Sequence, residues 1–499
     1  MDDDVQPNDS DGPMNAPAPG EGRSDTVAEP PSRGPDGRGK RWRLGLVLLV
    51  LLVLLAIVLL LLCGPRKQYL YHRTPKYRRR LLLEFGAHKD TQQAINAGLK
   101  WLADHQLEDG SWAGSKIRCP EGDRCTNVNY NSEYTGAVTG AALLAFLGRG
   151  ISEVPEKVDD PDQRRIETRF SKAVKKAIDY LLSTQSQEDG SWGEGYMYAQ
   201  GICTLALVEA EALTKRRDLQ PRIRKSLAFI TKSQSGEGGW DYYGQGKRKG
   251  NLERSDTSIM AWVFLSLMSA RSAGYAVPDQ TFLNVLSNCH RITDPKTQWV
   301  GYTHRGGNNT RTCLAVGLFS RLYLGYHPST SPVRTQARLL LENHVPPDYY
   351  VWYHAGVAMF QMQDFFPEWN TRVQYSLIGL QSRNRHMTGS WDALGEYEGK
   401  GGRVLTTALC VMSLEVYFRH LLLYGAGVEQ FPAPHAIVDH FAEEKDKTRR
   451  LIYLDELGYM VADRKVRDFL KAVAGKDPDE QIRAQAKASL DRLRARRDE

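Results

Sequence analysis

The sequence predicts an all-α protein of about six helical hairpins closed into a ring, preceded by one transmembrane helix and followed by a short helical hairpin. Three observations lead to this fold. A helical pattern recurs with a Gly-x-Trp ending, a more apolar helical segment follows each copy, and a run of twenty uncharged residues lies near the N-terminus. The composition, 41% hydrophobic and 25% charged over 499 residues, excludes collagen-like and small disulfide-rich chains.

The N-terminal part of the chain differs in composition from the rest. Residues 1–43 are rich in proline and acidic residues and have no aromatic residue before Trp42, which predicts a disordered tail. Residues 44–63 read LGLVLLVLLVLLAIVLLLLC and carry no charge. At about 1.5 Å per residue, such a helix crosses a hydrocarbon layer of about 30 Å. We therefore predict a single-pass membrane protein with an N-terminal anchor.

Residues 64–89 form a predicted juxtamembrane linker that is strongly basic. Basic residues beside a span favour contact with anionic lipid, so the span and this flank predict membrane lipid as a partner. Both flanks of the span are basic, which leaves open the side of the membrane on which the body lies. No basic stripe interleaved with aromatic residues is present, and no nucleic-acid partner is expected.

Two of the seven cysteines, Cys119 and Cys125, flank a polar loop, CPEGDRC. They form a disulfide if the body lies in an oxidising compartment. Two free thiols, or half of a metal site, are the alternatives. No second Cys/His pair has the spacing of zinc ligands, so we expect neither a metal nor a cofactor.

Four segments carry the repeat, at 96–112, 175–192, 224–240 and 372–391. In the first, Leu99, Leu102 and Gln106 fall on one helix face. Gly110 suits the positive φ of a helix end, and Trp112 provides a large ring with an N–H donor. A glutamine side chain both donates and accepts, so each copy can bridge neighbouring hairpins.

The segment after each turn is apolar on most faces, which predicts a helix buried on several sides. These inner helices are expected within 135–148, 201–213, 256–270, 310–325 and 404–418. Two further units are degenerate, one around Trp299 and one at 349–360. An open stack of such hairpins would expose apolar ends, whereas a closed ring would not.

The motif resembles the QW repeat of squalene and oxidosqualene cyclases over residues 90–425. The residues that match it are Gln106, Gly110 and Trp112; Gln185, Gly190 and Trp192; Gln234, Gly238 and Trp240; and Gln381, Gly389 and Trp391. The resemblance implies the α/α-toroid shared by terpene cyclases and protein prenyltransferase β-subunits, with inner and outer rings of six helices around a cavity.

The catalytic signatures that this resemblance implies are not intact. The cyclase motif D-x-D-D-T-A corresponds here to Glu253–Ser258, which places Ser255 where the proton donor would be. A hydroxyl is too weak an acid to protonate an alkene. The zinc motif of prenyltransferases would use Asp256 and His354, but Ser258 stands in place of the cysteine. Asp256 is more simply interpreted as a helix N-cap.

Several polar and aromatic side chains precede or begin the inner helices, where a toroid brings them to one mouth of its cavity. The candidate ligand-binding residues are Tyr134, Tyr198, Asp256, Arg311, Tyr353, His354 and Arg403. Convergent aromatic and polar groups are typical of a ligand pocket, although half-buried packing is the alternative for each tyrosine. Asp256, Tyr353 and His354 are the weak catalytic candidates, and Tyr353, His354 and Arg311 also suit a polysaccharide-lyase-like enzyme.

After a predicted linker at 426–446, residues 447–499 resemble HEAT-type repeats through Leu454, Leu457, Leu470, Pro478 and Leu490. One such hairpin cannot bury its own apolar face, so it packs on the toroid or docks a protein partner.

We therefore expect a catalytically diverged binding module whose cavity holds an isoprenoid, another lipid or a peptide. The alternatives are an active cyclase or prenyltransferase-like enzyme with a non-standard site, a lyase-like α/α-barrel enzyme, and an interaction scaffold.

Overall fold

The computed structural model describes residues 46–53, 73, 75–85, 89–112, 134–247, 252–342, 347–394, 396–424 and 430–496. The chain divides into two compact units, Met1–Leu62 and Cys63–Glu499. In the first unit, residues 46–53 of the predicted span are helical. The other residues of that span lie outside the described ranges, and within those ranges no helix is long and apolar enough to cross a membrane. The membrane anchor therefore stays a prediction.

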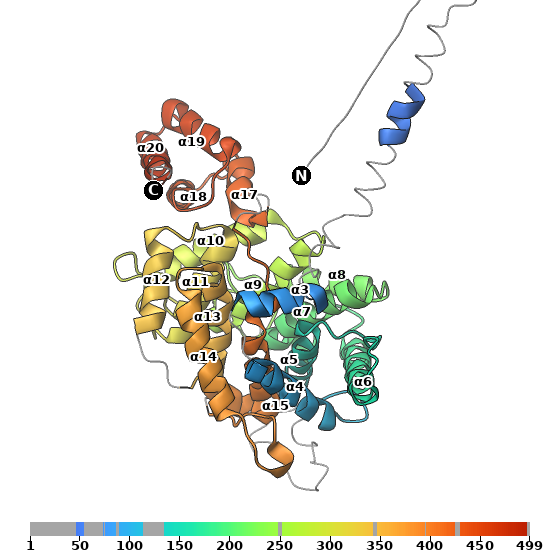
Figure 1. The fold of residues 1–499 in the computed structure, drawn as a ribbon. Helices are drawn as coiled ribbons and strands as arrows, with labels where there is room; N and C mark the ends of the chain where they lie inside the picture. The colour runs from blue at the N-terminus through green and yellow to red at the C-terminus, as the bar shows by residue number, and fades with distance from the viewer. Residues whose placement is uncertain are drawn as a thin grey trace, which may run out of the picture. The chain divides into compact units, whose positions relative to one another are not determined.

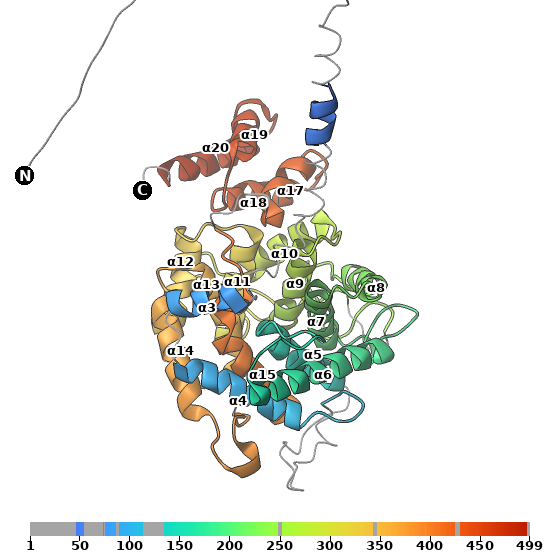
Figure 2. The same ribbon diagram turned by 45° about the vertical axis from the view of Figure 1, so that its right-hand side comes forward.

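The second unit contains an inner ring of six helices (Figures 1 and 2). These are α5 (Thr135–Gly148), α7 (Met197–Thr214), α9 (Thr257–Ser272), α11 (Arg311–Leu324), α13 (Tyr349–Gln361) and α15 (Glu396–Leu414). Each packs on the next, and α15 packs on α5, so the ring is closed. Almost every residue of these helices is buried, as their uniformly apolar sequences predict.

Six amphipathic helices surround that ring. They are α4 (Lys89–Asp104), α6 (Pro161–Thr184), α8 (Leu219–Lys232), α10 (Asp279–Ile292), α12 (Ser331–Glu342) and α14 (Phe366–Leu380). Helix α6 is representative, because Phe170, Val174, Ile178 and Leu181 lie on one face and are buried. The described part of the unit has no strand and only three isolated β-bridges. The all-helical toroid is thus present.

The repeated Gln-Gly-Trp motif joins four of the six outer helices to the next one in the ring. The Gln234 amide donates to the Gly238 carbonyl at 2.9 Å and to the Thr281 carbonyl of α10 at 3.0 Å. The Trp240 indole N–H donates to the Ile230 carbonyl at the end of α8, at 2.9 Å. The copies at Trp112, Trp192 and Trp391 repeat all three bonds. The fourth copy reaches Ala94 of α4, and so closes the outer ring.

The glycine of the motif is required by both backbone conformation and space. Gly238 has φ +95°, and a Cβ there would lie 2.1 Å from the Asn284 carbonyl oxygen of the next outer helix. Gly110 has φ +90°, and its Cβ would lie 2.2 Å from the Lys176 carbonyl oxygen. Any side chain at these positions would push adjacent outer helices apart.

In the two degenerate units, other contacts join the outer helices to their neighbours. Trp299 is half-buried, and Val300 packs beside it in the core against Gly317. The Gln336 amide of α12 donates to the Gln298 carbonyl at 3.0 Å, which replaces the glutamine bridge. Trp352 belongs to the inner helix α13 itself and is buried there. These units keep the hairpin while losing the motif.

The seam between the first and last hairpins is held by buried arginines. Arg73 is 3% exposed, and its guanidinium contacts Glu209 at 2.8 Å, the Leu147 carbonyl at 3.1 Å and the Arg419 carbonyl at 3.0 Å. The Arg419 guanidinium contacts both Glu209 oxygens at 2.9 Å and the Leu144 carbonyl at 2.6 Å. One carboxylate thus joins two cations from the two ends of the toroid sequence.

Residues inside the range predicted as a linker, 64–89, take part in this seam. Arg73 belongs to that range, and helix α3 (Pro75–Glu84) packs on α16 (Val416–Arg419). Phe85 packs edge-on against Phe360 and Phe366, with ring centroids 5.2 and 5.9 Å apart. The described part of this range is thus packed on the toroid.

A second buried carboxyl group, Glu415, lies near the same seam, and neither of its oxygens has a hydrogen-bond partner among the described residues. Burial raises its pKa to about 8, against the opposing charges of Arg419, Arg73, Arg149 and Arg78. The folded state therefore holds a proton that the unfolded chain releases near pH 4.5, and stability falls as the pH rises between these two values.

We expect Glu415→Gln to remove this loss of stability with rising pH. In urea unfolding at pH 5.5 and 8.5, the variant should be more stable relative to the wild type at pH 8.5 than at pH 5.5, because glutamine has no proton to release. The control is Glu368→Gln, which removes an exposed carboxylate that is paired with Arg372. An equal effect of Glu415→Gln at both pH values would contradict the prediction.

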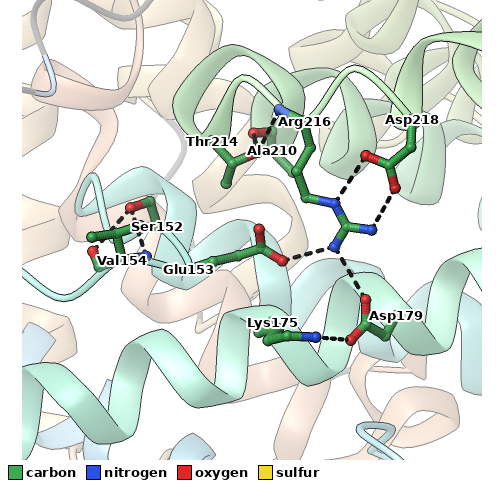
Figure 3. Close-up of polar contacts among 9 residues, drawn as sticks. All are labelled: Ser152, Glu153, Val154, Lys175, Asp179, Ala210, Thr214, Arg216 and Asp218. Atoms are coloured by element: carbon green, nitrogen blue, oxygen red, sulfur yellow. Dashed lines mark hydrogen bonds and ion pairs between the residues drawn. The ribbon is translucent and has the colours of Figure 1, made fainter.

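An ion-pair network at the rim ties α6 to the turn between α7 and α8 (Figure 3). Arg216 contacts Asp218 at 2.6 Å, Glu153 at 2.8 Å and Asp179 at 3.1 Å. Asp179 is also paired with Lys175, one turn earlier on α6, at 2.5 Å. The Arg216 guanidinium thus joins the loop before α6, helix α6 itself and the turn before α8.

The C-terminal segment has more helices than the predicted hairpin. They are α17 (Pro432–His440), α18 (Lys447–Leu457), α19 (Arg464–Lys476) and α20 (Glu480–Ala495), and α17 lies in the range predicted as a linker, 426–446. Helices α17 and α18 pack on α10, and α17 also contacts α11. The His290 ring contacts Glu456 at 2.7 Å, and the Val461 N–H donates to the Gly325 carbonyl at 2.8 Å. The segment packs on the toroid, and a protein partner stays a prediction.

Candidate functional site: an aromatic cavity

A cavity of about 160 Å³ lies where several inner helices begin. Seven of its lining residues are aromatic: Tyr134, Tyr196, Tyr198, Tyr242, Tyr243, Trp262 and Tyr350. The others are Ala137, Val138, Ile202, Lys400, Gly401 and Leu405. An apolar cavity of about 150 Å³ holds one benzene molecule in another protein, so this one suits an apolar group of similar size.

Local backbone structure places the tyrosines. Tyr196 and Tyr243 form a β-bridge, and the Met197 N–H donates to the Tyr242 carbonyl at 2.8 Å. This pairing joins the start of α7 to the loop after Trp240. The tyrosine rings pack against one another at tilted angles, and the centroid of the Tyr196 ring lies within 5.7 Å of those of Tyr134, Tyr198 and Tyr243. The wall is therefore packed before any ligand enters.

Asp256 stands behind this wall as the N-cap of α9. Its carboxylate accepts from the Ser258 backbone N–H at 2.9 Å and from the Ser258 hydroxyl at 2.6 Å, which confirms the N-cap interpretation. Within the described residues the other carboxylate oxygen, Oδ2, has no hydrogen-bond partner, and the Arg254 guanidinium lies 3.5 Å from it. Asp256 is fully buried, and burial raises its pKa above the ordinary value.

One chain of hydroxyls connects Asp256 with the cavity. The Tyr198 hydroxyl donates to the Ser258 hydroxyl at 2.8 Å, and Ser258 donates to Asp256. In the same wall, the Tyr242 and Tyr302 hydroxyls are 2.9 Å apart. Sequence reasoning missed Tyr242, Tyr243, Tyr302, Trp262 and Lys400. The first three lie in loops without a motif, and Trp262 looks like an ordinary core residue.

Ser255, at the position of the cyclase proton donor, is directed into the wall. Its hydroxyl contacts the Ser235 hydroxyl at 2.7 Å and accepts from the Gly239 N–H at 2.9 Å. It is buried and is not among the residues that line the cavity. The Ser255 hydroxyl is therefore too weak an acid to act as a proton donor, and it is directed away from the space that a ligand would occupy.

Tyr353 and His354 lie below the cavity rather than in its lining. The Tyr353 ring stacks on Trp262 at 5.3 Å, and the His354 ring meets Trp262 edge-on at 5.0 Å. His354 Nδ1 bonds the Tyr350 carbonyl at 2.9 Å, and burial lowers the pKa of His354 to about 4. Burial also raises the pKa of Tyr353. Together they form a packed floor between the cavity and the buried arginines.

The remaining predicted residues lie elsewhere. Arg403 contacts Ser390 at 3.0 Å and pairs with Asp392, and it does not line the cavity. Arg311 begins α11, is half-buried and is likewise absent from the lining. Tyr134 and Tyr198 are in the wall. Cys119 and Cys125 lie outside the described residues, so their pairing stays untested.

The zinc arrangement of prenyltransferases does not fit these residues. Ser258 binds Asp256 through its hydroxyl, and the His354 Nδ1 is engaged by a backbone carbonyl. Within the described ranges, the one set of close metal-ligand side chains is His290, Asp455 and Glu456, away from the cavity. Asp455 is already paired with Arg492 at 2.7 Å.

Comparison with known proteins gives a consistent family signal. The model of the squalene-hopene cyclase C-terminal domain matches residues 163–306. A probable squalene–hopene cyclase of Sinorhizobium fredii is 30% identical over 252 residues, which are 48% of this chain and 34% of that protein. The squalene–hopene cyclase of Bradyrhizobium diazoefficiens is 28% identical over 36% of this chain and 26% of its own length. The chain spans about a third or less of these relatives.

Among solved structures, an alpha-1,6-mannanase of Salegentibacter sp. HEL1_6 has a TM-score of 0.44 at 8% identity, covering 66% of this chain and 99% of that chain. An alpha-amylase from Clostridium perfringens has a TM-score of 0.40 over 65% of this chain and 97% of its own.

Proposed function

We propose that this chain, which is related to the squalene–hopene cyclases of the terpene cyclase family, is catalytically diverged and binds an apolar group in the toroid cavity. The observation that carries the proposal is the aromatic cavity from which Ser255, at the donor position, is turned away. A concave, mainly apolar site with a few polar groups is the usual form of a ligand pocket.

The size of the cavity limits what it holds. At about 160 Å³ it is smaller than the range of about 300–1,000 Å³ that encloses drug-sized ligands. It therefore takes one end of an isoprenoid or other lipid, or one peptide side chain, rather than a whole thirty-carbon chain. With the predicted span at 44–63 and its basic flank, the protein would work at a membrane carrying anionic lipid.

Binding of a small apolar probe tests this function. Ligand-observed NMR with 3,3-dimethylbutan-1-ol should show saturable binding to the full-length protein. Ala137→Leu, in the cavity wall, should abolish it by filling the space, whereas the exposed Ala228→Leu on α8 should not. Equal binding by both variants, or none by the wild type, would contradict the proposal.

A second candidate is an active cyclase that uses Asp256, favoured by the hydroxyl chain from this buried carboxyl to Tyr198 in the cavity wall. On the binding-module proposal, squalene incubated with the wild type gives no cyclised product. Ser255→Asp also gives none, because that side chain faces Ser235 and Gly239. Retained probe binding shows that the variant is folded, and a cyclised product from either protein would favour the enzyme.

A further inference from the structure

The outer face of helix α6 is strongly basic. The helix buries Phe170, Val174 and Ile178 against the inner ring, and its opposite side is exposed. In α6, which is described throughout, one exposed residue is acidic, Asp162, and it pairs with Arg165 at 2.7 Å. The exposed basic residues of the helix are Arg164, Arg165, Arg169, Lys172, Lys175 and Lys176.

The next outer helix, α8, continues this face (Figures 1 and 2). The Gln185 amide at the end of α6 donates to the Arg222 carbonyl of α8 at 3.1 Å. The exposed charges of α14, in contrast, are balanced, because Glu368 pairs with Arg372. Helix α8 contains no acidic residue. The exposed basic residues of α6 and α8 together are called the basic face, to which α8 contributes Arg224, Lys225 and Lys232.

A shallow groove of about 460 Å³ runs along the α6 part of the basic face. Arg165 and Lys175 of this helix pair with acidic residues, but exposed ion pairs of this kind are weak and exchange readily for another anion. Guanidinium and ammonium groups bind phosphate through charge-assisted hydrogen bonds. The groove therefore suits a phosphate group, and it is lined by Pro161, Arg164, Arg165, Thr168, Arg169 and Lys172.

The predicted span indicates where such phosphate groups would come from. Arg73 is buried in the seam of the toroid, and nine residues, 64–72, separate it from the predicted span. At about 3.5 Å per extended residue, this connection reaches at most about 35 Å. Helix α3 follows Arg73, and its Arg78 donates to the Arg149 carbonyl, while the Arg149 guanidinium pairs with Glu167 of α6 at 2.9 Å. A membrane that held the span would thus lie close to the α6 side of the toroid.

We propose that the basic face docks on a membrane surface by binding the phosphate groups of anionic lipids. Ile166 of α6 is 42% exposed and favours a lipid surface over an acidic protein, because membrane-surface helices combine basic residues with apolar side chains that enter the headgroup layer. Docking would hold the toroid in one orientation at the bilayer. The inference goes beyond the function proposed for the cavity, and it rests on the predicted membrane anchor.

Acetylation of single lysines tests this contact. The full-length protein is placed in nanodiscs of phosphatidylcholine, either alone or with about 30% phosphatidylglycerol to supply the anionic surface. A neutral N-hydroxysuccinimide ester is the reagent, so that the lipid charge does not repel it. Lys172 and Lys176 should react about fivefold more slowly in the anionic nanodiscs, the factor that one basic residue gains at an anionic surface. Lys487, exposed on α20, is the internal control and should react equally in both.

Charge reversal on the basic face should break the contact. Lys172→Glu should restore most of the reactivity of Lys176 in the anionic nanodiscs, because a negative charge then faces the lipid phosphates. Arg338→Glu, at an exposed arginine of α12, is the matched control and should leave Lys176 protected. Raising the salt concentration to about 0.5 M should weaken the protection in the wild type, because ions screen exposed charges.

Equal reactivity of Lys176 in the two kinds of nanodisc would overturn the proposed docking, and so would an equal slowing at Lys487. A protein that stays with neither nanodisc would overturn it as well, because no anchor would then hold the basic face at a membrane. Binding of the neutral probe in the cavity does not depend on any of these results, so the proposed function is tested separately.

Discussion

Replacing Glu209 by glutamine is expected to lower the free energy of unfolding by about 3–5 kcal/mol, the usual cost of removing one partner from a buried ion pair. Glu209 is 1% exposed and is the carboxylate that both Arg73 and Arg419 contact. Its loss takes from two buried guanidinium groups the carboxylate that both of them contact. Urea unfolding followed by circular dichroism measures the change.

The matched control is Glu368→Gln, which removes an exposed carboxylate paired with Arg372 one turn away. Exposed pairs of this kind contribute less than about 1 kcal/mol. If the two substitutions had similar effects, the buried cluster would not hold the seam, and the packing of Arg73 would need another explanation.

Truncation of the repeat tryptophans is expected to be as damaging. Trp192→Ala and Trp112→Ala should each destabilise the body by about 3–5 kcal/mol, as is typical of buried aromatic side chains. Both rings are buried, and each indole donates to the last turn of its outer helix, at 3.0 Å for Trp192 and 2.9 Å for Trp112. Thermal and urea unfolding of the purified variants would give the values.

Trp299→Ala is the internal control, because Trp299 is half-buried and belongs to a unit without the motif. Its truncation should cost clearly less than that of Trp192. A loss below about 1 kcal/mol for Trp112 and Trp192, the range of ordinary surface changes, would show that the repeat interpretation is wrong.

The ring could be predicted because its signals are local and repeated. Gln381, Gly389 and Trp391 are separated by a longer loop than the other copies, yet they make the same three bonds. The residue types alone set these bonds, since only glycine fits the close approach and only a long amide reaches the next helix. The two units without the motif could be placed only as degenerate hairpins.

The seam and the cavity were harder to predict, for a different physical reason. Arg73 is one of many basic residues near the predicted span, and nothing local marks it as the one that enters the core. Tyr242 and Tyr302 lie in loops and meet only through long-range packing. Arg311 and Arg403 were placed at the mouth by their helix position, but side-chain pairing decides which of these residues reach the cavity.

Native mass spectrometry of the full-length protein released from detergent, with the retained lipid identified after extraction, tests the binding function most directly. The account predicts an apolar molecule bound one to one to the wild type and to Ala228→Leu, and absent from Ala137→Leu. A mass without ligand for the wild type, or the same ligand retained by Ala137→Leu, would contradict a role of the cavity in binding.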